Sequence, residues 1–133
     1  MTTTATFAIL IGLMCLAAGI GGLLRPQEWG RMFDELETSP GLMISVAFIA
    51  ILFGSVVILL HPWWDTWLQV LVSLIGWLSF IEGLALLSVP HIYIALVKPL
   101  LGYARAWALF TLLLGVILLG AGLAARTAAA TLY

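Results

Sequence analysis

Long apolar runs alternate along this chain with short polar or turn-forming segments. At 1.5 Å per residue, about twenty helical residues cross a hydrocarbon core of about 30 Å. Four runs reach that length with few or no charged residues, so we predict an all-α membrane protein with four transmembrane helices. Their expected bounds are 4–24, 41–60, 67–89 and 102–125.

The connection after the first run has the pattern of an amphipathic helix. Within 26–38, apolar side chains recur at the i, i+3, i+4, i+7 spacing, and polar residues cover the opposite face. The apolar positions are Trp29, Met32, Phe33 and Leu36, and the acidic ones are Glu28, Asp34, Glu35 and Glu37. Pro26 suits a first helical position because it has no N–H to satisfy. We expect this helix to lie along the membrane surface, where its acids could also attract a basic partner.

The other connections are a tryptophan-rich turn and a second surface segment. Segment 61–67 contains three tryptophans, which favour the membrane interface. Its shortness predicts that the second and third spans are antiparallel neighbours. Segment 90–98 repeats the surface segment in a more apolar form and ends at Pro99, and the tail 127–133 is expected to leave the membrane.

An internal duplication relates the two halves of the chain. Five residues, Gly12, Gly19, Leu23, Pro26 and Trp29, return 64 positions later as Gly76, Gly83, Leu87, Pro90 and Tyr93. In the following span, Gly41 and Gly54 match Gly102 and Gly115 at an offset of 61. We therefore expect one integral membrane domain, 1–133, made of two hairpin repeats, about 11–60 and 75–121, that share one orientation. Each hairpin would hold a short interfacial amphipathic helix, with Pro26, Trp29, Pro90 and Tyr93 as hinge and interfacial anchors.

Small residues four positions apart mark candidate packing faces in three of the spans. Such pairs allow close approach of helix backbones, as is required for association in a bilayer. They are Ala18 with Gly22, Ala50 with Gly54, and Ser79 with Gly83. The expected architecture is a four-helix bundle.

Glu82 is the one acidic residue within the apolar runs. An acidic side chain in hydrocarbon costs at least about 2.5 kcal/mol, so such residues usually face the bundle interior, pair, or stay protonated. Two interpretations stay open: a structural carboxyl at a helix crossing, or a site for a proton or ligand. Its counterpart in the first repeat is Ala18.

The composition supports the membrane class and argues against several kinds of partner and site. The chain is 64% hydrophobic and 8% charged, far below the roughly 25% charged residues of soluble domains. A net charge of −1 with no basic run argues against nucleic acid as a partner. His61 and Asp65 form neither a metal site nor a triad, and His91 is expected at the opposite membrane face. We expect no catalytic, metal-binding or cofactor-binding residues, and no enzyme activity.

Basic residues indicate the orientation. Arg25, Arg31, Lys98 and Arg105 flank the first and third connections, whereas Arg126 alone lies toward the other side. Because positive residues mark the cytoplasmic side, we expect both termini outside a plasma membrane, the inner membrane of a bacterium.

The stretch 18–32, AGIGGLLRPQEWGRM, resembles the YjeT-like family of small bacterial inner-membrane proteins, whose function is unassigned. Glu82-Gly83-Leu84, placed eight residues before Pro90, is similar to the family's glutamate motif. The resemblance covers about 11–60 and 75–121 and implies two tandem units, each with two spans joined by a Pro-x-x-Trp hinge. Tyr93 replaces the hinge tryptophan in the second unit, and Ala18 replaces the glutamate in the first.

Three functions fit these features. The leading hypothesis is a non-enzymatic accessory or assembly subunit of a larger membrane complex, which contacts the lipid bilayer and binds other membrane-protein subunits or a second copy through its helices. The alternative is a small oligomeric proton-coupled transporter or channel that uses Glu82. Its size resembles that of the small multidrug-resistance exporters, although their essential glutamate lies in the first helix and here the first span has none. A lipid or quinone binder is the third.

Overall fold

The computed structural model describes residues 2–131, and nearly all of them are helical. The elements are α1 (Thr2–Leu24), α2 (Pro26–Thr38), α3 (Pro40–Leu60), α4 (Trp67–Ser88), α5 (Pro90–Val97), the 3-10 helix η1 (Lys98–Tyr103) and α6 (Ala104–Thr131). Four of them, α1, α3, α4 and α6, are long and apolar enough to cross a membrane. The predicted all-α chain with four long apolar helices is therefore confirmed, and it is typical of a multi-pass membrane protein.

Proline and side-chain caps set where the helices begin. Pro26, Pro40 and Pro90 each occupy the first position of a helix, where the missing N–H leaves no bond unmade. Thr66 and Gln69 form a reciprocal capping box at the start of α4. These local signals account for the close match between predicted and observed helix starts at residues 26, 67 and 90.

The fourth span and its approach differ from the sequence prediction. Pro99 ends α5 but does not end helical structure, because the chain continues through η1 before α6 begins at Ala104. At the other end α6 runs to Thr131, although the tail from Thr127 was expected to leave the span. The alanine-rich tail has high helix propensity and no proline or glycine to stop it.

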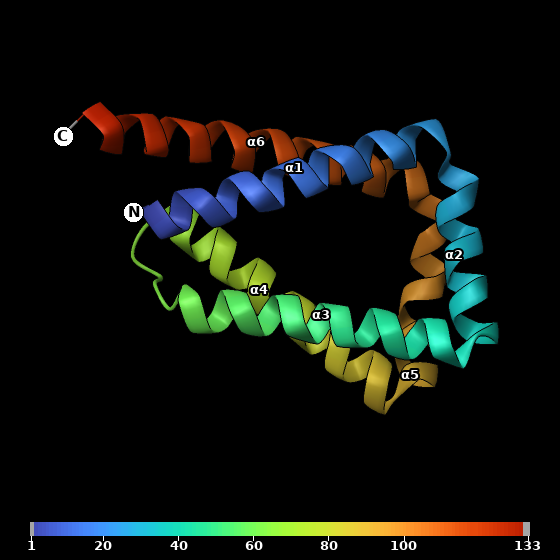
Figure 1. Ribbon diagram of the computed structural model, residues 1–133. Coiled ribbons are helices and arrows are strands. Elements are labelled where there is room, and N and C mark those ends of the chain that lie inside the picture. The colour runs from blue at the N-terminus through green and yellow to red at the C-terminus, as the bar shows by residue number, and fades with distance from the viewer. Residues whose placement is uncertain (1, 132–133) are drawn as a thin grey trace.

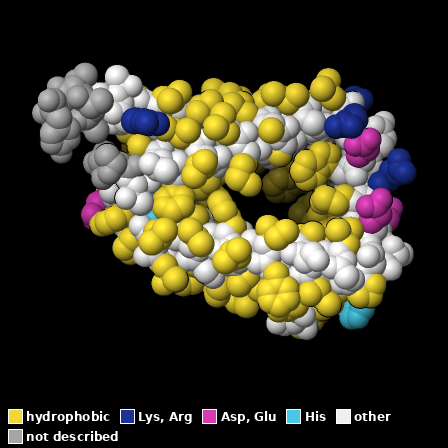
Figure 2. Space-filling view, viewed as in Figure 1, with side chains coloured by type: hydrophobic (Ala, Val, Ile, Leu, Met, Phe, Trp, Pro, Cys, Tyr) yellow, Lys and Arg dark blue, Asp and Glu magenta, His cyan; other side chains and the backbone are white. Residues whose placement is uncertain are grey.

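The long helices pack in two pairs (Figure 1). Helix α1 lies along α6, and α3 lies along α4, as the short turn between them predicts. The start of α1, the end of α6 and the α3–α4 turn lie at one end, while α2, α5 and η1 cross the other. Because α2 carries the chain across this end, α1 and α3 fall into different pairs. Many large hydrophobic side chains of the long helices are exposed, and they cover much of the face seen in Figure 2.

Glycines bring the two backbones of each pair together. A β-carbon built on Gly115 would lie 2.7 Å from the backbone nitrogen of Leu16, so α6 touches the main chain of α1 there. On α3, a β-carbon at Gly54 would lie 2.5 Å from the backbone nitrogen of Phe80 on α4. Both distances are too short for any side chain, so each helix pair depends on its glycines.

A small ion cluster joins the crossing segments. The Lys98 Nζ lies 2.9 Å from Glu37 Oε1 and 3.9 Å from Asp34 Oδ1, which links η1 to α2. The hydrogen bond to the Glu37 carboxylate raises the pKa of the exposed Lys98 ammonium. The cluster is exposed, so it links the two crossing segments but contributes little to stability.

We predict opposite effects for two glycine substitutions on α6. Gly115→Ala should lower the free energy of unfolding by about 1–3 kcal/mol, because the helices must move apart. Gly120→Ala, where nothing lies within 4 Å of the new β-carbon, should raise it by about 0.5–1 kcal/mol through helix propensity. Denaturation followed by circular dichroism in mild detergent measures both. Equal effects would show that the close contact at Gly115 does not hold the pair.

Candidate functional site

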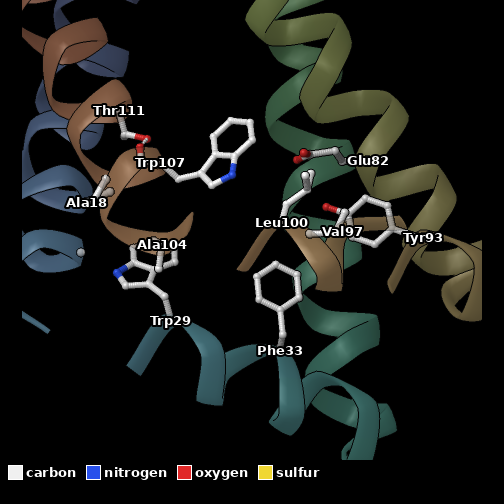
Figure 3. Close-up of a pocket in the computed structure, with 12 residues that line it drawn as sticks. Ala18, Trp29, Phe33, Glu82, Tyr93, Val97, Leu100, Ala104, Trp107 and Thr111 are labelled. Atoms are coloured by element: carbon white, nitrogen blue, oxygen red, sulfur yellow. Dashed lines mark hydrogen bonds between the residues drawn. The ribbon is translucent and has the colours of Figure 1, made fainter. Parts of the chain in front are cut away.

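A pocket opens between the two helix pairs at the end crossed by α2, α5 and η1. Its volume is about 290 Å³. Six elements contribute the side chains that line it (Figure 3): Ala18, Gly22, Trp29, Phe33, Glu82, Tyr93, Val97, Leu100, Ala104, Trp107, Ala108 and Thr111. Figure 2 shows a hollow between the pairs with hydrophobic side chains around it.

Aromatic rings form much of the pocket wall. Trp29 and Phe33 lie one turn apart on α2, so the apolar face expected to rest on the membrane surface turns toward the pocket. Tyr93 comes from α5 and Trp107 from α6. Gly22 lets the Trp29 ring lie close to α1, since a β-carbon there would lie 3.2 Å from the Trp29 indole nitrogen.

Glu82 is the single charged residue among those that line the pocket. Its carboxyl group points from α4 into the open space (Figure 3). The Tyr93 hydroxyl is its hydrogen-bond partner. Burial, with the adjacent Glu82 charge, raises the pKa of Tyr93 to about 12. The phenol therefore stays protonated and donates to the carboxylate.

The pocket gathers residues that the sequence analysis had assigned to different roles. Glu82 was a candidate functional residue, Trp29 and Tyr93 were interfacial anchors, and Ala18 and Gly22 were packing residues; all five line one space. The duplication expected from the sequence would equate position 18 with 82 and position 29 with 93. The residues at all four of these positions line the pocket.

The remaining predicted residues lie elsewhere. Pro26 and Pro90 are the first residues of α2 and α5. They thereby set where Trp29 and Tyr93 lie in the first turn of each helix. Ala50, Gly54, Ser79 and Gly83 lie where α3 meets α4, and the Ser79 hydroxyl donates to the Ala50 carbonyl at 3.0 Å. None of these four residues lines the pocket.

Sequence reasoning missed the contribution of α6 to the pocket. Trp107 and Thr111 lie one turn apart on α6, and the Thr111 hydroxyl donates to the Trp107 carbonyl at 2.8 Å. The spacing alone could have placed them on one face, but nothing in the sequence predicted that α6 pairs with α1. That pairing brings Trp107 opposite Glu82.

A second polar cluster closes the opposite end of the molecule. His61 is buried: its Nε2 lies 2.8 Å from Thr4 Oγ1 on α1, and its Nδ1 lies 2.9 Å from Ser73 Oγ on α4. The rings of Phe7 and Trp63 contact it edge-on. His61 was expected in an interfacial turn beside Asp65, and this cluster was not predicted, because Thr4 and Ser73 lie 57 and 12 residues away in sequence.

The hydrogen bonds of this cluster are consistent with a neutral imidazole. Ser73 Oγ lies 2.8 Å from the Trp63 carbonyl, which can only accept. The Ser73 hydroxyl thus donates to Trp63 and accepts from His61 Nδ1–H, which leaves Nε2 to accept from Thr4. Burial also lowers the pKa of His61. The cluster therefore links α1 to α4 as a structural clamp and offers no free group for chemistry.

No group of three His, Cys, Asp or Glu that could hold a metal ion occurs within residues 2–131. Searches of family models, curated proteins and solved structures find no match to this chain.

We predict that acid weakens the clamp at His61. Because its folded-state pKa lies below the ordinary value of 6.5, the unfolded chain binds a proton that the folded chain does not. The free energy of unfolding should be constant above pH 6.5 and fall as the pH drops below it. His61→Gln should flatten this dependence, whereas His91→Gln, on the exposed residue of α5, should retain it.

Thermal unfolding in detergent between pH 8 and pH 5.5 measures this dependence. A slope that persists in His61→Gln would contradict the prediction.

Proposed function

We propose that this chain is a non-enzymatic multi-pass membrane protein that binds a small amphipathic molecule in the Glu82 pocket. One observation carries the proposal: the single acidic residue of the four apolar helices points into a pocket between the two helix pairs. Ionisable residues inside membrane segments are costly and usually mark binding sites or proton pathways. An apolar pocket with one or two convergent polar groups is the usual form of a small-molecule site.

A proton-coupled transporter or channel is the form of this function that we favour. The pocket lies between α1/α6 and α3/α4, so a change in the separation of the pairs would change access to Glu82. A carboxyl in this position can hold a proton or a ligand in turn. The walls come from both halves of one chain, and oligomerisation would add to this site without being required to build it.

The accessory-subunit function is our second proposal. It was motivated by small-residue faces, but Gly22, Gly54 and Gly83 lie against other parts of this chain. Its remaining support is the apolar surface of the long helices, including the exposed Leu24, Leu52 and Leu59. Lipid covers such a surface equally well, so we rank this proposal below ligand binding.

We also propose that the chain is a tandem duplication of a YjeT-like unit. Matching contacts support this: Gly115 approaches the backbone of Gly12 and Leu16, and Gly54 approaches that of Gly76 and Phe80. Residues 12 and 76, and 16 and 80, are 64 apart, while 54 and 115 are 61 apart. The contacts of α1 with α6 thus repeat those of α4 with α3.

Orientation and location complete the proposal. The positive residues Arg25, Arg31, Lys98 and Arg105 favour a cytoplasmic position for α2, α5 and η1, with both termini outside a bacterial inner membrane. The pocket would then lie near the cytoplasmic face.

A pair of tryptophan substitutions on α6 tests ligand binding. The protein is purified in mild detergent, and native mass spectrometry identifies molecules that remain bound. Ala104→Trp, which fills the pocket, should lose the bound molecule, whereas Ala106→Trp, exposed and outside the lining, should retain it. Glu82→Gln should weaken binding and Glu35→Gln, on the exposed face of α2, should not.

A protein that carries no small molecule, or one equally bound after Ala104→Trp, would contradict the pocket proposal. A stoichiometric protein partner in the same preparation would instead support the accessory-subunit function.

A further inference from the structure

The side chains that line the pocket carry negative charge only. Glu82 is its single ionisable group apart from the Tyr93 phenol, and none of the twelve lining residues is Lys, Arg or His. Two of the cations at this end pair with acids outside the lining: Arg25 lies 3.4 Å from Glu28, and Lys98 binds Glu37. A carboxylate in apolar surroundings without a protein cation is complementary to a positively charged ligand.

The aromatic side chains of the pocket also favour a positively charged ligand. The faces of aromatic rings attract cations, with tryptophan strongest, and rings around a quaternary ammonium are a common recognition mode. Trp29, Phe33, Tyr93 and Trp107 enter the pocket from α2, α5 and α6, while Glu82 enters from α4 (Figure 3). Trp29 and Trp107 face Glu82 across the space, whereas Tyr93 lies beside the carboxylate.

The pocket has few hydrogen-bond acceptors. Besides the Glu82 carboxylate, the side chains of the lining offer only the hydroxyl oxygens of Tyr93 and Thr111 as acceptors. A primary ammonium carries three N–H donors, and those left unpaired in an apolar site cost free energy. A cation without N–H donors avoids that cost.

From charge, rings and acceptor content together, we infer that the pocket binds a small lipophilic monocation of the quaternary-ammonium type. The cationic centre lies at Glu82 among the aromatic faces, and the apolar group lies toward Leu100, Val97 and Ala104. The volume of about 290 Å³ limits the ligand to a single ring or short alkyl chain. This inference rests on the proposed ligand-binding function and names its ligand class.

The test compares a cation with an uncharged molecule of the same shape. Benzyltrimethylammonium and neopentylbenzene differ by one nitrogen in place of carbon. Each is titrated calorimetrically into the full chain in detergent, and the signal from Ala104→Trp, whose pocket is filled, is subtracted to remove partitioning into the micelle. We expect the cation to bind at least about tenfold more tightly, a difference of about 1.4 kcal/mol.

Two variant pairs assign the effect to residues. Glu82→Gln should weaken binding of the cation at least about tenfold and leave the uncharged molecule unchanged, whereas Glu35→Gln should alter neither. Trp107→Leu should weaken the cation more than the uncharged molecule. Trp64→Leu, in the turn at the far end, is its control.

The outcomes separate this inference from the proposed function. Equal binding of both probes, or cation binding that Glu82→Gln leaves intact, overturns the cationic ligand class while the pocket remains a binding site. Absence of pocket-specific binding for either probe also overturns the inference. The proposed function is judged separately, by whether Ala104→Trp removes the molecule that accompanies the purified protein.

Discussion

Direct contact between helix backbones organises this structure. In a bilayer, apolar side chains gain little by leaving lipid for protein, so helices associate mainly where small residues allow close packing. The glycines at 12, 19 and 115 serve α1 and α6, and those at 54, 76 and 83 serve α3 and α4. Each pair therefore closes on itself, and the space between the pairs is held by fewer contacts.

The two ends of that space have different chemistry. At the end with the α3–α4 turn, His61 connects Thr4 of α1 to Ser73 of α4 and every polar atom of the three side chains is paired. At the other end α2 and the α5–η1 segment cross between the pairs, and their aromatic side chains surround a pocket instead of filling it. The helix pairs are joined at the end with His61 and stand apart at the other end, so Glu82 faces the pocket between them.

Helices were predictable from the sequence where the signal is local, and so was the pair of α3 with α4, which a short turn joins. The other pair was not. Apolar run length and the prolines at 26, 40 and 90 determine where elements begin, because both act within one or two turns. The pairing of α1 with α6 depends on glycines more than a hundred residues apart. Glu82, Trp29 and Tyr93 were recognisable singly because charge in an apolar run and aromatic residues after a proline are local features. Trp107 was not, because its place at the pocket depends on that pairing. The partners of His61 were not, because Thr4 and Ser73 come from two other helices, α1 and α4.

Under the proposed duplication, the differences between the two halves follow from the fact that their corresponding positions face one pocket. A glutamate at position 18 as well as 82 would place two carboxyl groups around a single apolar space, where like charges disfavour one another's ionisation. Alanine at 18 leaves Glu82 as the sole acid, and the pocket keeps a defined negative side. Tyrosine in place of tryptophan at 93 adds a hydroxyl that donates to Glu82. Trp29 lies near Ala18, where there is no carboxyl group to accept a hydrogen bond, and it contributes an aromatic ring to the pocket. One half thus supplies the charge and its hydrogen-bond donor, and the other supplies α2 with its Trp29 and Phe33 rings.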